Sequence, residues 1–387
     1  MRILTALHEG LDDLFHPPAT NVASLDVLRS AAILLVFTGH YVGLFSADPD
    51  LPHFVLFRWG WTGVDLFFVL SGYLIGAQLW KELDRTGRIR IGHFLLRRGL
   101  RIWPLYFAFV GFAAALYFFR SDIRRIWCDV FFVSNVPFFS WGFVAGGWSL
   151  STEEQFYTLT PILLSLFALK LKPRRMWVTI LGGLAVVIAT RGWVIAHSSL
   201  PIANLRATLY YPSYTHADGL AVGMFLGWIV VFYKRLLQSR LFAALAVALM
   251  LVAGLVVYQI KPLLLNFTAL GLIYGAMELY GISTLPFPGV LRWRAFYLIS
   301  RLSFGLYLNH IAVITYLYPM LADFADRGTF GLASVYLLCL AASLLVAMVT
   351  FLFIEWPFLR IRARWVDRDK AVRAQLNLRT LAHPSGA

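Results

Sequence analysis

Cysteine and charge are both scarce in this chain. Its 387 residues include only two cysteines, Cys128 and Cys339. Their spacing is not that of a metal site, so we expect neither a structural disulfide nor a metal centre. Only 14% of the residues are charged, whereas 59% are hydrophobic and the mean hydropathy is +0.71. This composition excludes a soluble globular domain and predicts a membrane protein.

A cleavable signal peptide is not expected either. The first 24 residues contain no apolar core of sufficient length and include Asp12, Asp13 and two adjacent prolines. The first membrane helix would therefore direct insertion. No internal repeat or low-complexity tract is visible. We divide the chain into a cytoplasmic N-terminal segment (1–24), a transmembrane domain (25–358) and a basic cytoplasmic tail (359–387).

Long apolar runs dominate the rest of the sequence. A run of about 20 apolar residues is long enough to cross the hydrocarbon core as a helix. We therefore predict an all-α transmembrane bundle of about ten membrane helices. The predicted spans are 25–46, 59–80, 102–119, 148–168, 176–196, 214–233, 241–259, 263–281, 302–322 and 330–354.

Basic residues outnumber acidic ones by 34 to 20, which gives a net charge of +14. If the N-terminus is cytoplasmic, 26 of the 34 Lys and Arg residues fall on the cytoplasmic side of the predicted helices. This asymmetry follows the positive-inside rule, and an even number of crossings places both termini in the cytoplasm. Membrane topology thus explains the charge, and we expect no nucleic-acid partner.

His40 lies deep inside the first apolar stretch, with Arg29 eleven residues before it. Eleven residues make almost three full helical turns, so both side chains lie on one face. Ionisable groups inside membrane helices usually face a cavity or a partner. A neutral imidazole can take a proton from a hydroxyl, so His40 is the first candidate for catalysis. The alternative is a histidine that only hydrogen-bonds two helices together.

Arg98 and Arg101 precede the third predicted helix, within a basic cytoplasmic loop (81–101). Three positions apart, they share a helix face. Two planar, forked guanidiniums side by side suit the phosphate oxygens of a ligand. The alternative is ordinary positive-inside anchoring.

Two further segments place acids near apolar helices. In the segment 147–157, helical spacing puts Glu153 and Tyr157 on one face, although a capped and solvated helix start would also explain one acid. In the segment 64–74, Asp65 lies within an apolar run, where a functional or paired role is expected. The small pair at Ser71 and Gly72 suits close helix packing or the approach of an acyl chain.

Taken in order, these motifs resemble the acyltransferase-3 family, polytopic bacterial proteins that O-acylate cell-surface and exported glycans. The resemblance covers about residues 22–358. It rests on Arg29 and His40, the segment 64–74, Arg98 and Arg101 leading to Pro104 and Tyr106, the segment 148–157, and downstream on 218–223, 303–310 and 355–358.

The resemblance implies roles for several of these residues. His40 is expected to be catalytic with Arg29 as its partner, and Arg98 and Arg101 are expected to bind the donor, acyl-CoA. Asp65 or Glu153 would orient the imidazole or stabilise its charged form. We expect substrate contacts from Ser71, Tyr73, Trp148, Ser149, Tyr157, Asp218 and His310.

The expected reaction moves an acyl group, acetyl by resemblance, from cytoplasmic acyl-CoA to a hydroxyl of a glycan or glycoconjugate at the outer side of a bacterial inner membrane. Direct transfer and an acyl-enzyme both remain open. Some relatives add an extracytoplasmic esterase-like domain. We expect none here, so a two-domain mechanism would need a partner from the glycan-assembly machinery. Beyond this partner and the membrane lipids, the sequence indicates neither an oligomeric state nor a metal.

Two other classes of protein are consistent with ten charged membrane helices. A transporter or flippase of lipid-linked sugars is one, although such proteins often show repeats and interrupted helices. A non-catalytic membrane scaffold is the other, and it would tolerate the loss of His40.

Overall fold

The protein is a bundle of long helices. The computed structural model describes residues 2–19, 21–45, 59–117, 125–136, 142, 144–260, 262–325 and 328–366, and these contain no β-strand. The all-α prediction is confirmed. Ten helices overlap the ten predicted spans: α2 (Ala23–Phe45), α4 (Gly63–Thr86), α5 (Ile91–Tyr117), α7 (Gly147–Ala168), α8 (Trp177–His197), α10 (Asp218–Phe232), α12 (Arg240–Ile260), α13 (Pro262–Ile282), α14 (Arg294–Ala325) and α15 (Thr329–Thr350).

Shorter elements connect or flank these helices. They are α1 (Arg2–Phe15), α6 (Ile126–Val130), α9 (Ile202–Tyr210), α11 (Lys234–Gln238), the 3₁₀ turns Gly60–Thr62, Pro173–Arg175 and Gly289–Arg292, and a π-helical turn Phe351–Glu355 that continues α15.

Within the residues that the structure describes, seven helices are long and apolar enough to cross a membrane: α2, α4, α8, α12, α13, α14 and α15. A further helix, α10, is apolar but shorter. The remaining two predicted spans, α5 and α7, fall outside this set of seven. Both carry charged residues of the site described below.

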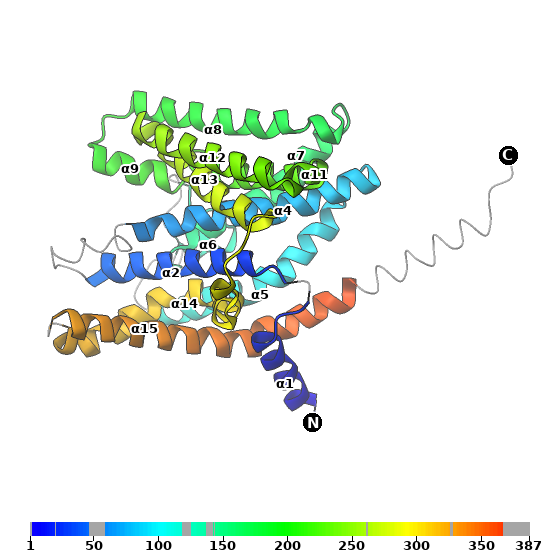
Figure 1. Cartoon of the computed structure of the whole chain (residues 1–387). Helices are drawn as coiled ribbons and strands as arrows, with labels where there is room; N and C mark the ends of the chain where they lie inside the picture. The colour runs from blue at the N-terminus through cyan, green and yellow to red at the C-terminus, as the bar shows by residue number, and fades with distance from the viewer. Residues whose placement is uncertain are drawn as a thin grey trace.

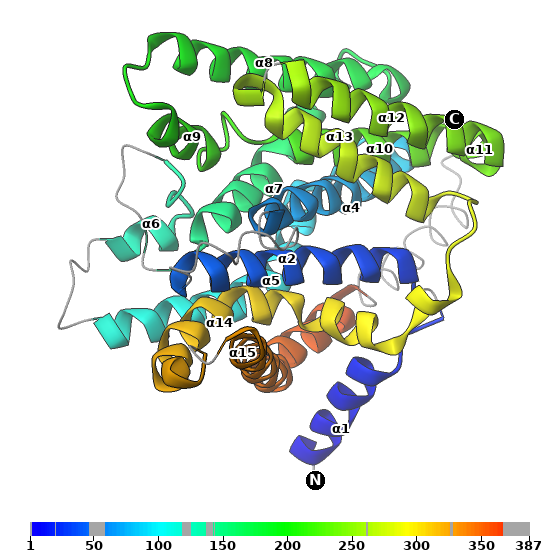
Figure 2. The same cartoon turned by 60° about the vertical axis from the view of Figure 1, so that its left-hand side comes forward.

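The helices form layers, from α8 through α4 and α2 to α15 (Figures 1 and 2). In α4, 78% of the most apolar window is buried inside the protein, against 11% in α8 and in α12. The apolar faces of α8 and α12 are therefore left for lipid, whereas α4 is the central helix. A Cβ on Gly72 or Gly223 would strike the backbone of the facing helix, so α4 and α10 pack backbone to backbone.

The basic loop predicted over 81–101 is much shorter in the structure. Helix α4 continues to Thr86 and ends at Gly87, whose φ of 67° suits glycine, and α5 begins at Ile91. Arg98 and Arg101 therefore lie on α5, not in a loop. The prediction placed the helix ends at the limits of the apolar runs, but intrahelical hydrogen bonds continue beyond the apolar stretch.

The segment 120–147, which joins α5 to α7, is described in part, since 120–124, 137–141 and 143 lie outside the described residues. Here α6 packs inward, with Cys128 and Asp129 buried. Ser134 hydrogen-bonds Ser151 at 2.8 Å, and the Asn135 amide donates to Thr152 at 3.1 Å. This part of the segment is thus fixed to α7. Of the predicted basic tail, 367–387 also lies outside the described residues.

Candidate functional site

Five helices, α2, α4, α5, α7 and α14, surround a cavity of about 120 Å³, called the central cavity below. It brings together residues from five separate motifs of the sequence. Its polar lining residues are Arg29, Ser71, Arg98, Arg101, Ser149, Glu153, Tyr157, Ser303 and Tyr307.

Three arginines give this cavity its charge. Arg29, Arg98 and Arg101 make no hydrogen bond or ion pair with any other residue of the described segments. The Arg98 guanidinium instead lies over the Tyr157 ring, 5.5 Å from its centroid. Like charges that share a poorly solvated cavity are costly unless an anion offsets them. The central cavity is therefore suited to an anionic ligand.

Glu153 is held at the wall of the central cavity by two hydroxyl groups. The Ser71 hydroxyl donates to Oε1 at 2.5 Å, and the Tyr157 hydroxyl donates to Oε2 at 3.0 Å. The expectation that Glu153 and Tyr157 share a helix face is confirmed. Glu153 thus joins α4 to α7, and within the described residues it makes no ion pair with the arginines of the cavity.

His40 lies in contact with His310 of α14. In His310, Nδ1 lies 3.0 Å from the Leu306 carbonyl and 2.8 Å from the Tyr307 carbonyl, and Nε2 lies 3.1 Å from His40 Nδ1. Carbonyl oxygens only accept, so His310 Nδ1 carries the hydrogen and its Nε2 accepts from His40 Nδ1. His40 Nδ1 is also 3.0 Å from the Val36 carbonyl. In this tautomer His40 Nε2 keeps a free lone pair, as a base or nucleophile requires.

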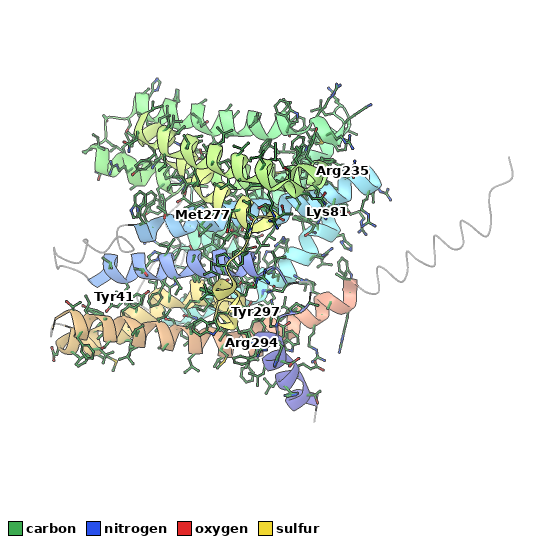
Figure 3. The ribbon with its side chains drawn as sticks, in the orientation of Figure 1. Tyr41, Lys81, Arg235, Met277, Arg294 and Tyr297 are labelled. Atoms are coloured by element: carbon green, nitrogen blue, oxygen red, sulfur yellow. The ribbon has the colours of Figure 1, made fainter. Side chains whose placement is uncertain are left out.

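The two histidines do not line the central cavity but lie just beyond one end of it. Tyr307 lines the cavity, and its ring centroid is 5.9 Å from that of His310. Arg29 lines the cavity too, so the structure places it with the other arginines and not against His40. Figure 3 shows Tyr41, the neighbour of His40, at the end of the bundle opposite Lys81 and Arg235.

Asp65 and Asp218 have partners of their own. Asp65 Oδ1 lies 2.8 Å from His216 Nε2, so the structure pairs this acid with His216 rather than with His40. Asp218 binds the fully buried Arg191 and accepts a hydrogen bond from Thr268 at 2.5 Å. Neither aspartate lines the central cavity.

Arg191 was not among the predicted site residues, although a lone arginine within an apolar span indicates a buried partner. Two expected substrate contacts also lie elsewhere. Trp148 packs against Tyr210, with ring centroids 4.7 Å apart, and Tyr73 packs with a small apolar cluster. Three of the residues expected to contact substrate do line the central cavity: Ser71, Ser149 and Tyr157.

Comparison with known proteins identifies the family of the chain. The relatives include the peptidoglycan O-acetyltransferase OatA of Listeria monocytogenes, 27% identical over 373 residues (87% of this chain, 55% of the relative), and the O-acetyltransferase OatA of Staphylococcus aureus, 24% identical over 365 residues (86% and 56%). The chain thus spans just over half the length of the curated relatives it matches. No solved structure matches it significantly. The family described as an acyltransferase domain, acyltransferase-3, matches residues 22–352, and the chain belongs to this family.

Proposed function

We propose that this protein is a membrane O-acyltransferase that moves an acetyl group from acyl-CoA to a hydroxyl of a glycan or glycoconjugate. The observation that carries the proposal is the set of three arginines, Arg29, Arg98 and Arg101, that share the central cavity with a single acid, Glu153, and make no ion pair within the described residues. Acyl-CoA is a polyphosphorylated donor, and planar guanidiniums bind phosphate oxygens with two parallel hydrogen bonds.

The chemistry requires a group that takes the proton of the acceptor hydroxyl, and we assign it to His40 Nε2. In direct transfer, this nitrogen removes the proton while the hydroxyl oxygen attacks the thioester carbonyl. The C–S bond then breaks, and the coenzyme A thiolate leaves and takes up a proton. In the covalent route, Nε2 itself attacks the carbonyl, the C–S bond breaks and the coenzyme A thiolate leaves. The acceptor hydroxyl then attacks the acyl-imidazole, the C–N bond breaks, and the freed imidazole takes up the hydroxyl proton.

We place the reaction across a bacterial cytoplasmic membrane. In this topology ten helices cross the membrane and both termini are cytoplasmic, as the distribution of basic residues supports. The arginine-lined cavity would then take the donor from the cytoplasm, and His40 would meet the acceptor near the outer surface. The name of the Listeria relative supports a glycan acceptor.

The test measures acetyl-CoA consumption by the purified protein in nanodiscs, with a panel of glycan acceptors. His40→Ala should abolish acceptor-dependent consumption, whereas His197→Ala, on the exposed part of α8, is the matched control. Equal turnover in wild type and His40→Ala would overturn the proposal. Donor-independent sugar transport by the wild type would favour a transporter. Labelled protein that accumulates with donor alone would identify the covalent route.

A further inference from the structure

A second cavity lies at the same end of the bundle as His40, between α9, α13, the end of α12 and the 3₁₀ turn Gly60–Thr62. We call it the aromatic cavity. Its volume is about 340 Å³. It is lined by the aromatic residues Trp61, Tyr210, Tyr258 and Phe267, the polar residues Arg206 and Asn266, and three aliphatic side chains.

Two polar side chains that line this cavity have no partner among the described residues. Asn266 Oδ1 is buried, and no described group donates a hydrogen bond to it. Arg206 makes no hydrogen bond or ion pair within the described part of the chain. A buried amide oxygen without a donor is rare and calls for a ligand or a bound water. Because this oxygen can only accept, its missing partner must offer a hydrogen.

The chemistry of the lining indicates which ligand would fit. The C–H face of a pyranose ring is apolar and packs on aromatic rings, while the hydroxyl groups at its edge donate and accept hydrogen bonds. A lipid acyl chain would leave Asn266 Oδ1 without a donor. A phosphate headgroup would suit Arg206, but its unprotonated oxygens would face the Asn266 oxygen with no hydrogen to offer. A sugar satisfies the rings, the amide oxygen and the guanidinium together.

The aromatic cavity is joined to the candidate site by two direct contacts. Gly39, the neighbour of His40, packs so closely on Gly60 and Trp61 that a Cβ at Gly39 would meet their backbone. On the other side, Trp148 contacts Tyr210, while the adjacent Ser149 lines the central cavity. A chain held in the aromatic cavity would therefore lie close to both parts of the site.

From this geometry we propose that the aromatic cavity binds a sugar residue of the acceptor glycan and so selects the acceptor. The inference rests on the proposed function, and it adds a binding site that the family resemblance does not assign. Under the proposed topology the cavity opens on the outer side of the membrane, where the glycan would be found.

The test uses Asn266→Leu, which keeps the size of the side chain but removes the accepting oxygen, with the exposed Asn204→Leu on α9 as the matched control. Binding of chitotetraose, maltotetraose and a galactan oligomer to protein in nanodiscs is followed by saturation-transfer difference NMR. At least one oligosaccharide should bind the wild type and Asn204→Leu. For Asn266→Leu its Kd should rise about tenfold, the effect of losing one hydrogen bond to a buried group.

Kinetics supply a second readout. Asn266→Leu should raise the KM for the glycan and leave the KM for acetyl-CoA unchanged. The inference is overturned if no oligosaccharide binds the wild type, or if Asn266→Leu binds as well as Asn204→Leu. It is also overturned if native mass spectrometry instead finds phosphatidylglycerol that is lost in Arg206→Ala. Asn266-dependent sugar binding by a protein that never consumes acyl-CoA would support this cavity while refuting the proposed transferase.

Discussion

His310 Nε2 lies 3.1 Å from His40 Nδ1, although 270 positions of the chain separate the two residues. The His310 ring is itself fixed by two carbonyls of its own helix. It therefore acts on His40 as an acceptor that selects one tautomer and one ring orientation. A buried, neutral acceptor is a weaker orienting group than a carboxylate, but it adds no charge to a membrane interior.

We expect His310 to be a positioning residue whose loss lowers kcat without changing the KM for acyl-CoA. In His310→Gln, the side-chain oxygen can still accept from His40 Nδ1, whereas His310→Leu leaves that N–H with only the Val36 carbonyl. His310→Leu should therefore lose roughly tenfold more kcat than His310→Gln, about the effect of one hydrogen bond.

Steady-state kinetics over a range of pH would check this prediction, because a change in the orientation or basicity of His40 should also move the pH profile. His93→Leu, on α5 and outside both cavities, is a suitable control. Equal loss in the Gln and Leu variants with an unchanged pH profile would mean that His310 only fills space.

Arg98 and Arg101 are expected to bind the donor. Replacing both with Ala should raise the KM for acyl-CoA by about tenfold or more for each residue, because a hydrogen bond to a charged group contributes about 1.5–3 kcal/mol. Replacing both with Lys should restore only part of the affinity, since the charge survives but the forked geometry does not.

The same kinetic assay with Arg174→Ala and Arg175→Ala combined provides a charge-matched control on exposed arginines. If donor affinity is the same in all these variants, Arg98 and Arg101 act only as topological anchors.

The hydroxyls that hold Glu153 should also affect donor binding. When Ser71→Ala and Tyr157→Phe are combined, both carboxylate oxygens lose their donors and can turn toward the arginines. The KM for acyl-CoA should then rise, because a freed carboxylate offsets the charge that the donor phosphates need. Adding Glu153→Gln to this background should lower the KM again, since an amide forms no ion pair.

A binding assay with radiolabelled acetyl-CoA would measure the donor affinity of the wild type, the Ser71→Ala/Tyr157→Phe variant and the triple variant directly. If adding Glu153→Gln to the Ser71→Ala/Tyr157→Phe variant leaves the affinity for acetyl-CoA unchanged, the Glu153 carboxylate does not compete with the donor for the arginines.

The sequence predicted the helices better than the contacts between them. Periodicity is a local property, so the common face of Glu153 and Tyr157 could be derived from spacing alone. The partners of His40 and Asp65 could not, because His310 and His216 come from helices distant in the chain and nothing in the local pattern fixes which helices meet. The resemblance named Asp65 as a site residue, but only the packing of α4 beside His216 shows where its carboxylate is directed.

Asp218 was expected to contact substrate, but the structure gives it a buried ionic partner, Arg191. Arg191 donates to the Thr215 carbonyl at 2.9 Å and to the Leu264 carbonyl at 2.6 Å, and its third donor group binds Asp218. Removing one member of a buried pair leaves an uncompensated charge and costs about 3–5 kcal/mol, whereas replacing both with apolar groups costs much less. Asp218→Leu should therefore unfold at a markedly lower temperature than the double variant Arg191→Leu/Asp218→Leu. In folded Asp218→Leu, both KM values should equal those of the wild type. If Asp218→Leu instead unfolds at the wild-type temperature and has a raised KM for the glycan, Asp218 binds substrate and the prediction is wrong.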